Sequence, residues 1–571
     1  PLESIPMKLQ IEQPIVDALV GAHPRLAWLQ EQMRFGNRAE VDFAQLEHDE
    51  LHYLEGLFAD AGPHMRARAA QIATLRQALG ADAPRFTADE LDVLVPPIAH
   101  YLAEGAVRGW LFSTATPDRP TAWVVTRLDF TPSSNDEVGK VFIEMKANTR
   151  GKVATHTVRI VAGDIAGRSV GEILAAKGLV RETAALIATY DDMEARYFDW
   201  RARYGEQFSG RGTGLYAENP TASHRDTDWS RKDVVILSSS GGDARLVNDE
   251  GILAERVLTL DAPGEILGTY LRKAAKGSRY IDEDAAEDAR KALPKGLFTR
   301  LPVHFHILMF HLDLHHYLWV HVADIHPYEY KPALRHKLVL PEEQTDLIDI
   351  LTAEMDLLMD DIVEGKSGGT TVLCAGPPGV GKTLTAEVYS EIIRRPLYRV
   401  HSGQLGLSVS NMETILKDVL TRAQRWGAVM LIDEADVYIK RRDDDITMNA
   451  VVGVFLRVLE YFNGLLFLTT NRIDDIDEAI VSRCIALIKY SPPDDAGRRR
   501  IWQVMAEQFG LVLEADITDQ LVALFPAATG RDIKGLAKLV AKYCKQKQCP
   551  ADLAAFTRCA TFRGLEVSHR G

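Results

Sequence analysis

The fold of this 571-residue chain is constrained most by one glycine-rich segment, Gly376-Pro377-Pro378-Gly379-Val380-Gly381-Lys382-Thr383. A buried-strand pattern, Thr371–Ala375, leads into it, and a helical pattern begins at Leu384. The spacing is G-x4-GK[ST], and the strand–loop–helix context gives this motif its meaning. Its glycines let backbone N–H groups curl around phosphate oxygens, and the helix N-terminus adds its dipole. The segment therefore predicts an α/β fold with the parallel sheet of a P-loop nucleoside triphosphatase.

The same segment assigns chemical roles to individual side chains. We expect Lys382 to reach the β- and γ-phosphates of ATP and the Thr383 hydroxyl to ligate Mg²⁺. The residues expected to contact the nucleotide here are Gly376, Pro377, Pro378, Gly379, Val380, Gly381, Lys382, Thr383 and Leu384.

A second apolar run, Val429–Ile432, ends in two carboxylates, Asp433 and Glu434. A fully apolar run of this kind is typical of a strand buried in a parallel sheet. We expect Asp433 to hold the metal shell beside the nucleotide and Glu434 to polarise the attacking water. The pair thus predicts hydrolysis and not binding alone.

Three more polar residues follow at positions that suit the same chemistry. Asn471 ends the strand pattern Leu465–Thr470, where an amide can help place the water on the γ-phosphate. Arg483 comes just after a short helical pattern, where an arginine can act as a finger toward a neighbouring subunit. The alternative for Arg483 is a salt-bridged surface arginine. Arg531 lies near the start of a helical pattern, within reach of bound nucleotide.

The order of these motifs resembles the AAA family of AAA+ ATPases over about Leu340 to Tyr543. The matching segments are GPPGVGKT, LIDEAD, LTTNR, SRC and TGRDI, and the segment Trp426–Arg483 is similar to a branch with a long N-terminal region ahead of one AAA module. The resemblance implies a helical lid and a homo-oligomeric ring, usually a hexamer, because the arginine must come from the next subunit. The roles it implies are Walker A (Lys382, Thr383), Walker B (Asp433, Glu434), sensor 1 (Asn471), arginine finger (Arg483) and sensor 2 (Arg531).

The chain departs from the family pattern in two places. Many AAA unfoldases grip a threaded chain with an aromatic residue, but the corresponding loop, Ser402–Ser410, has none, and only Leu405 and Leu407 are candidates to line a pore. Many members carry two arginines after the short helix, whereas Arg483 stands alone before Arg498.

Composition restricts the partners and the compartment. The net charge of −14 argues against nucleic acid as the main partner. No apolar stretch has the length of a membrane span, and the first residues lack a signal-peptide pattern. Five cysteines without a CxxC pair are typical of a reducing compartment, so the expected location is the cytoplasm.

The distribution of helical, strand and loop patterns along the chain predicts six regions. They are a helical N-terminal region (1–105), an α+β domain (106–204), a linker or mobile loop (205–232), a strand-rich domain (233–340), the AAA+ core (341–495) and a helical lid with a C-terminal tail (496–571). The strand-rich domain contains His304, His306, His311, His315, His316, His321 and His326. Two of them, His304 and His306, have a spacing that can hold a metal on one strand face, and the alternative is hydrogen-bonded interior imidazoles.

The leading functional hypothesis is a mechanochemical ATPase that remodels an unknown protein or protein complex bound by its N-terminal region. A clamp-loader-like motor linked to nucleic acid is an alternative, since Ser482-Arg483-Cys484 resembles the finger of those ATPases. A nucleotide-dependent binding switch is a third, although the intact Asp433-Glu434 pair argues against it. No motif before Leu340 identifies a client.

Overall fold

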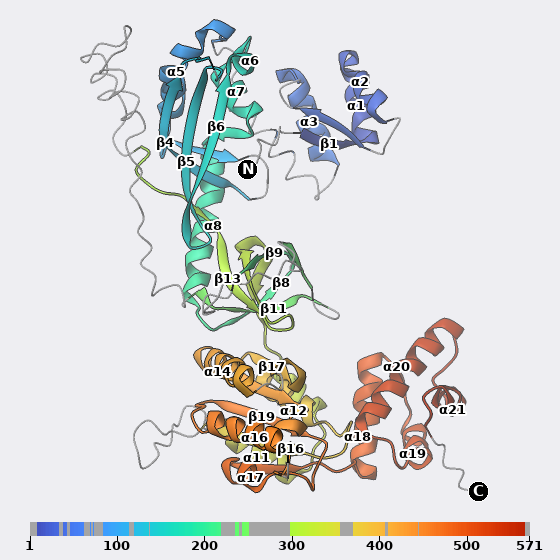
Figure 1. The fold of residues 1–571 in the computed structure, drawn as a ribbon. Coiled ribbons are helices and arrows are strands. Elements are labelled where there is room, and N and C mark those ends of the chain that lie inside the picture. Colours follow the sequence, from blue (N-terminus) through green and yellow to red (C-terminus); the bar gives the residue numbers. More distant parts are fainter. Residues whose placement is uncertain are drawn as a thin grey trace. The chain divides into compact units, whose positions relative to one another are not determined.

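The computed structural model describes residues 8–33, 38–42, 46–61, 69, 72, 84–113, 119–135, 137–218, 234–238, 242–250, 297–353, 369–405, 409–442 and 445–565 (Figure 1). The chain divides into two compact units, each described by itself. The first unit comprises Pro1–Ala202, Glu250–Leu308 and Trp319–Asp324, and the second comprises Arg203–Asp249, Met309–Leu318 and Ile325–Gly571. Among the helices of the described ranges, none combines the length and the apolar run that crossing a bilayer requires.

The first unit opens with short helices, as the sequence predicts. Their bounds are α1 Gln13–Ala22, α2 Trp28–Gln32, α3 His48–Asp60, η5 Ala88–Val93 and α5 Val95–Ala103. Two strands were not foreseen: β1 (Lys8–Glu12) pairs antiparallel with β2 (Arg38–Asp42). Among the side chains described in these strands, Ile11, Ala39 and Val41 are buried, and both strands are short, so their sequences show no clear strand pattern. Three apolar residues of the predicted helical region 1–105, Phe43, Leu75 and Leu79, lie outside the described residues.

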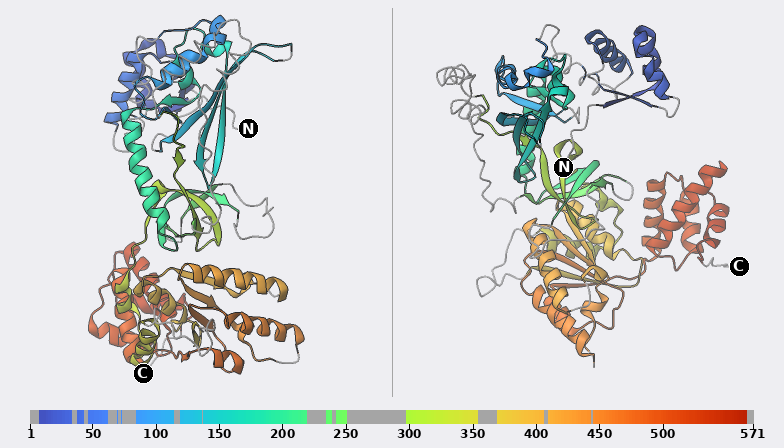
Figure 2. Two further views of the ribbon diagram at one scale, coloured as in Figure 1. Left: turned by 90° about the vertical axis from the view of Figure 1, so that its left-hand side faces the viewer. Right: turned by 45° about the horizontal axis from the view of Figure 1, so that its top comes forward.

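A six-stranded sheet follows, with the order β12-β5-β4-β3-β7 and with β6 paired to β5. The strands are β3 Trp110–Ser113, β4 Thr121–Thr131, β5 Lys140–Thr149, β6 Lys152–Val161, β7 Leu179–Arg181 and β12 Val303–His304. The helices are α6 Ala162–Ile165, α7 Val170–Ala176 and α8 Ala184–Ala202. The long helix α8 lies beside this sheet (Figure 2). Its buried Tyr190 packs edge-on against Trp110, with 4.9 Å between the ring centroids.

A seven-stranded sheet lies mostly in the second unit, with the order β10-β9-β14-β13-β11-β8-β15. Its strands are β8 Gln207–Gly210, β9 Gly212–Ala217, β10 Val234–Leu237, β11 Ala244–Asn248, β13 His306–His311, β14 His316–His321 and β15 Ile325–Pro327. The strand-rich texture expected between Val234 and Tyr330 is therefore present in the described part of that range.

The prediction of a linker or mobile loop over 205–232 is wrong for its first half, which forms β8 and β9. The segment is rich in glycine, which predicts a loop, but two of these glycines are needed inside the sheet. A Cβ on Gly210 would stand 2.6 Å from Leu246 Cδ1, and one on Gly214 would stand 3.3 Å from Leu318 Cδ1. Large apolar side chains thus occupy the space that a side chain at either glycine would need. Residues 219–232 lie outside the described part of the chain.

The histidines between His304 and His326 fit the interior alternative better than a metal site. The described ranges contain no group of three or more His, Cys, Asp or Glu arranged to hold a metal ion. His304 Nε2 is 3.0 Å from the Ala122 carbonyl oxygen. Burial lowers the pKa of His304 and of His306 to about 4 and that of His321 to about 3, so all three are neutral at pH 7.

The predicted AAA+ core contains a five-stranded parallel sheet with the order β17-β18-β19-β16-β20. The strands are β16 Thr370–Ala375, β17 Leu397–His401, β18 Val429–Asp433, β19 Leu465–Thr470 and β20 Ala486–Lys489. The helices are α11 Glu342–Ala353, α12 Lys382–Ile392, α13 Ser402–Leu405, α14 Val409–Arg425, α15 Asp436–Ile439, α16 Ile446–Leu459 and α17 Glu478–Arg483. Every residue of β18 and β19 is buried, as expected for strands covered on both faces, and the predicted fold class is confirmed.

The helical lid contains α18 Asp495–Phe509, α19 Ala515–Leu524, α20 Gly530–Lys547 and α21 Leu553–Thr561 (Figures 1 and 2). These helices share a core of their own, in which Trp502, Leu521, Ile533, Leu536 and Phe556 are fully buried. Thr529 caps α20 through its hydroxyl, which accepts a hydrogen bond from the Asp532 backbone N–H. The cap fixes where the helix begins, and Arg531 therefore lies in its first turn.

Candidate functional site

The glycine-rich loop runs from the end of β16 to the start of α12, and its shape requires glycine. Gly379 and Gly381 have φ angles of +86° and +104°, a region that favours glycine. A Cβ on Gly379 would also stand 2.7 Å from Thr529 Oγ1. The loop thus curves tightly where the lid meets it, and the backbone N–H of Arg531 donates to the Gly379 carbonyl at 3.2 Å.

Lys382 lies inside this loop. Its Nζ donates to the carbonyl oxygens of Gly376 and Pro377, both at 2.7 Å, and to Asn471 Oδ1 at 3.0 Å. Burial lowers the pKa of Lys382, partly offset by the charges of Asp433 and Asp436. Two predicted site residues that stand 89 positions apart in the chain, Lys382 and Asn471, are therefore in contact.

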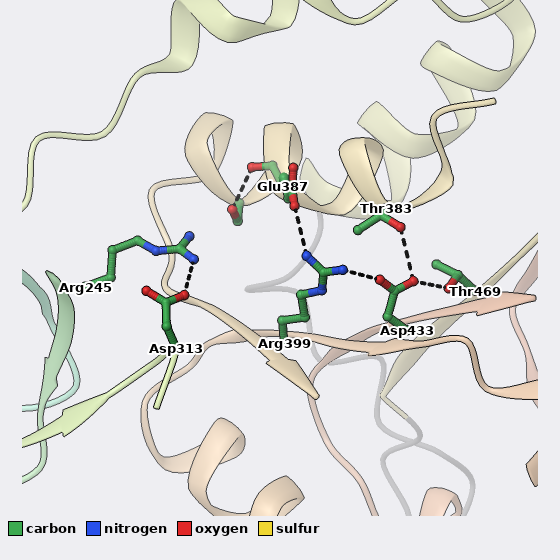
Figure 3. Close-up of polar contacts among 8 residues, drawn as sticks. Arg245, Asp313, Thr383, Glu387, Arg399, Asp433 and Thr469 are labelled. Carbon is green, nitrogen blue, oxygen red and sulfur yellow. Dashed lines mark hydrogen bonds and ion pairs between the residues drawn. The ribbon is translucent and has the colours of Figure 1, made fainter. Parts of the chain in front are cut away.

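Asp433 lies at the end of β18, where three side chains converge on its carboxylate (Figure 3). Its Oδ1 accepts hydrogen bonds from Thr383 Oγ1 at 3.1 Å and from Thr469 Oγ1 at 2.5 Å. Its Oδ2 accepts one from Arg399 at 2.6 Å. Burial favours the neutral acid, but the hydrogen bond from Thr469 and the charge of Arg399 outweigh it, so the pKa of Asp433 lies below its usual value.

Arg399 was not predicted as a site residue. It stands in β17, the strand beside β18, and its guanidinium also lies 3.6 Å from Glu387 Oε1 on α12 (Figure 3). Burial raises the pKa of Glu387, and the charge of Arg399 acts against this. The only sign of Arg399 in the sequence is a charged residue within the otherwise apolar strand pattern LYRV.

Glu434 has a φ angle of +56°, the left-handed conformation that residues other than glycine rarely adopt. Its backbone N–H donates to Thr469 Oγ1 at 3.0 Å, and its side chain is exposed. The same threonine hydroxyl donates to Asp433, so Thr469 contacts both the Asp433 carboxylate and the Glu434 backbone at this edge of the sheet. Backbone strain of this kind is concentrated at functional sites.

The remaining predicted site residues lie around this centre. Pro378 and Leu384 are exposed, and Val380 packs against the core of the parallel sheet. Arg531 reaches the loop through its backbone, and its side chain is exposed. Within the described residues, Arg483 instead contacts Ala479 at 3.2 Å and Glu460 at 4.0 Å on its own chain.

Leu405 and Leu407 were the candidates for a pore lining. Leu405 is completely buried at the end of α13, which does not suit a side chain that grips a threaded polypeptide. Leu407 lies outside the described residues.

A buried carboxylate, Asp249, joins the seven-stranded sheet to the ATPase core within the second unit. It is fully buried and accepts hydrogen bonds from three side chains: Tyr317 (2.7 Å), Trp426 (2.9 Å) and Arg425 (3.2 Å). Next to it, Arg422 donates to the hydroxyls of Tyr317 at 3.1 Å and Tyr398 at 2.9 Å. The hydrogen bonds made by Asp249 and Arg422 thus connect α14 and β17 to β14 in the interior of the second unit.

Comparison with known proteins agrees with this geometry. Residues 372–491 match the model of the family described as "ATPase family associated with various cellular activities (AAA)". Protein SAV of Sulfolobus acidocaldarius is 29% identical over 190 residues, 31% of this chain and 24% of its own length. Vesicular-fusion protein SEC18 of Candida albicans is 28% identical over 30% of this chain and 25% of its own length. Human peroxisomal ATPase PEX1 is 29% identical over 29% of this chain and 14% of its own length.

The chain thus spans a quarter or less of the length of these three relatives. A solved structure, the E. coli MS115-1 HORMA:CdnC:Trip13 complex, aligns with 40% of this chain and 91% of its own matched chain, at 18% identity and a TM-score of 0.33. The family match falls on the parallel sheet and its glycine-rich loop, and it confirms the resemblance read from the sequence. Residues 372–491 of this chain are therefore a domain of the AAA family, and a long region precedes that domain.

Proposed function

We propose that this protein binds ATP with Mg²⁺, hydrolyses it, and uses the cycle to remodel a protein or protein complex. The observation that carries the proposal is the convergence of Lys382, Thr383, Asp433 and Asn471 at one edge of the parallel sheet. Strands β16, β18 and β19 are parallel neighbours there, and their carboxyl ends meet. This is where open α/β sheets bind their ligands.

The donor set suits the metal. Thr383 Oγ1 and Asp433 Oδ1 are hard oxygen ligands 3.1 Å apart beside the loop, and Mg²⁺ prefers such ligands together with substrate phosphates. When bound, the ion neutralises charge on the phosphates. The pair Thr383 and Asp433 is therefore proposed to hold it.

The other residues divide the work of hydrolysis. Residues Gly376 to Leu384 cradle the phosphates, with Lys382 as the cation beside them. Glu434 accepts a proton from the attacking water, and Asn471 orients that water. Arg531 faces the nucleotide from the lid. These roles are inferred from the positions and the chemistry of the side chains, because the carboxyl ends of the parallel strands lie together at one edge of the sheet.

A homo-oligomeric ring, most simply a hexamer, completes the proposal. Arg483 is 38% exposed and is directed at weak partners on its own chain, so its guanidinium is free to serve the nucleotide of an adjacent subunit. The client is proposed to be a protein held by the region before Leu340. Relatives named for vesicle fusion and for proteasome activation support a protein target over nucleic acid. The five regions other than the one over residues 205–232, and a cytoplasmic location, remain predictions from the sequence.

The test compares the wild type with Glu434→Gln in ATP and Mg²⁺, measuring mass in solution and phosphate release together. We expect both proteins to assemble and only the wild type to turn over, with the variant slowed about 100-fold or more. A wild type that neither assembles nor releases phosphate, with or without added clients, would contradict the proposal.

A further inference from the structure

The C-terminal end of helix α20 brings two cysteines together. Gln548 ends the helix with a φ angle of +52°, and the backbone N–H of Cys549 donates to the Cys544 carbonyl oxygen at 3.3 Å. This is the closing hydrogen bond of a Schellman motif, in which a left-handed residue turns the chain back over the last helical turn. The motif characteristically places the side chains of the two bonded residues in contact. Here both of those side chains are thiols.

The contacts and the exposure of Cys544 and Cys549 are those of two neighbouring free thiols. The Cys544 thiol donates to the Pro550 carbonyl oxygen at 3.4 Å, and both cysteines are free. Burial, together with a hydrogen bond to the Cys549 side chain, raises the pKa of Cys544 to about 11. The pair is partly exposed, whereas Cys559 on the neighbouring helix is buried. A small oxidant can therefore reach Cys544 and Cys549 while Cys559 stays protected.

We propose that Cys544 and Cys549 form an oxidisable pair that closes to an intramolecular disulfide when the protein meets a peroxide. Because the raised pKa of Cys544 disfavours its thiolate, Cys549 attacks the peroxide as the thiolate, breaking the O–O bond, so that a sulfenic acid forms and the departing hydroxide takes up a proton and leaves as water. The second thiol then attacks the sulfenic sulfur and displaces a second water. Two thiols and one hydrogen peroxide give one disulfide and two waters. Each sulfur loses one electron, and the peroxide gains two.

The disulfide would fix one end of a helix that touches the ATPase site at its other end. Cys544 lies in the last turn of α20, and the first turn of the same helix donates the hydrogen bond from Arg531 to Gly379. The bond cross-links the turn that holds the end of α20 and so limits fraying there. Because the cross-link is reversible by thiols, the modification suits a transient role in a reducing compartment.

Tryptic digestion gives a direct test on the full-length protein. Cleavage after Lys542, Lys545, Lys547, Arg558 and Arg563 separates Cys544, Cys549 and Cys559 into three different peptides. The folded protein is treated with hydrogen peroxide, its remaining thiols are blocked by alkylation, and the digest is analysed by mass spectrometry. We expect one linked pair, the peptide 543–545 joined to the peptide 548–558. The five free thiols per chain should fall by two, to three, and return to five with a dithiol reductant.

Two variants serve as controls. Cys559→Ser should give the same linked pair as the wild type, and Cys549→Ser should give none. A linked pair that persists in Cys559→Ser and disappears in Cys549→Ser supports the proposal. Peptides carrying only sulfinic or unmodified cysteine, or a link from either residue to Cys559, would overturn it.

Discussion

Arg399 lies against Asp433, with 2.6 Å between a guanidinium nitrogen and the Oδ2 atom of the carboxylate proposed to face Mg²⁺. The same guanidinium is 3.6 Å from Glu387 on α12, the helix that begins at Lys382. Arg399 thus contacts both a proposed metal ligand and the helix that follows the glycine-rich loop, and it fixes their relative positions.

Replacing that arginine should impair catalysis more than folding. In Arg399→Leu the Asp433 carboxylate loses its positioning partner, and a misplaced catalytic group commonly costs about 10- to 100-fold in rate. We expect a loss of this size in phosphate release at saturating ATP, and partial recovery in Arg399→Lys, which keeps the charge but not the planar fork. Glu387→Gln is the matched control, because it removes the other contact of Arg399 and should retain most activity. Equal losses in Arg399→Leu and Glu387→Gln would show that the helix contact matters instead.

Gly379→Ala should weaken nucleotide binding by about 10- to 100-fold. Its φ angle of +86° disfavours any side chain, and the added Cβ would stand 2.7 Å from Thr529 Oγ1 and 3.0 Å from Arg531 Cβ. The strain should cost roughly 1–3 kcal/mol, relieved by opening the loop or displacing the lid. Calorimetric titration with ATP reports the binding. Gly453→Ala in α16, where a Cβ meets nothing within 4 Å, is the control and should bind normally. Normal binding by Gly379→Ala would refute the tight loop geometry.

Mixing two inactive variants should test whether Arg483 acts across subunits. Glu434→Gln lacks the proposed base, and Arg483→Ala lacks the proposed finger. In mixed rings, some interfaces combine Glu434 of one subunit with Arg483 of the next, so phosphate release should reappear on mixing. Arg457→Ala, which removes another exposed arginine with an acidic partner, should be active by itself. If the mixture stays as inactive as its components while both assemble, Arg483 is a surface arginine.

Asp249→Ala should be strongly destabilising. It leaves the partly buried guanidinium of Arg425 and the buried indole N–H of Trp426 without their carboxylate. Removing one partner of such a buried pair costs about 3–5 kcal/mol. Urea unfolding followed by tryptophan fluorescence measures the loss. Arg245→Ala breaks a half-exposed pair with Asp313 on the same sheet and should cost no more than about 1 kcal/mol. Comparable midpoints for the two variants would contradict the account of Asp249 as the anchor.

Acid should destabilise the first unit through its histidines. Burial lowers the pKa of His304 and His306 to about 4, below the ordinary value of 6.5 that they regain on unfolding. Between these values the unfolded chain binds more protons, so stability is complete above pH 6.5 and is lost as the pH falls toward 4. Each unit of pKa depression corresponds to about 1.4 kcal/mol. Thermal melting of the full chain from pH 7 to pH 5 should show the decline, and His306→Gln should flatten it. A variant that melts with the same pH dependence as the wild type would exclude this cause.

The ATPase core was predictable because its evidence is local. A strand pattern, a glycine-rich loop and a helix start fall within a dozen or so residues around Gly379, and the ends of parallel neighbouring strands must meet. The proximity of Lys382, Asp433 and Asn471 follows from that rule. Their backbone details, such as the left-handed conformation of Glu434, do not, because they depend on how Thr469 is placed.

What the sequence did not reveal depends on partners far along the chain. Arg399 gains its meaning from Asp433, 34 residues later, and Asp249 from Trp426, 177 residues later. Neither pair has a sequence spacing that can be recognised as a motif, because connecting segments of many different lengths would allow the same contact. The glycines of β8 and β9 misled for the same reason: the side chains that fill the space beside Gly210 and Gly214 come from other strands.

The contact between Arg531 and Gly379 is made by main-chain atoms alone. Substitution at position 531 can therefore exchange the side chain that is proposed to face the nucleotide while the backbone hydrogen bond between the lid and the loop stays in place. The affinity of the site for nucleotide can in this way be changed without changing how the lid is positioned on the glycine-rich loop. A series of residues at position 531 would vary what the lid offers to the nucleotide without varying where the lid is attached.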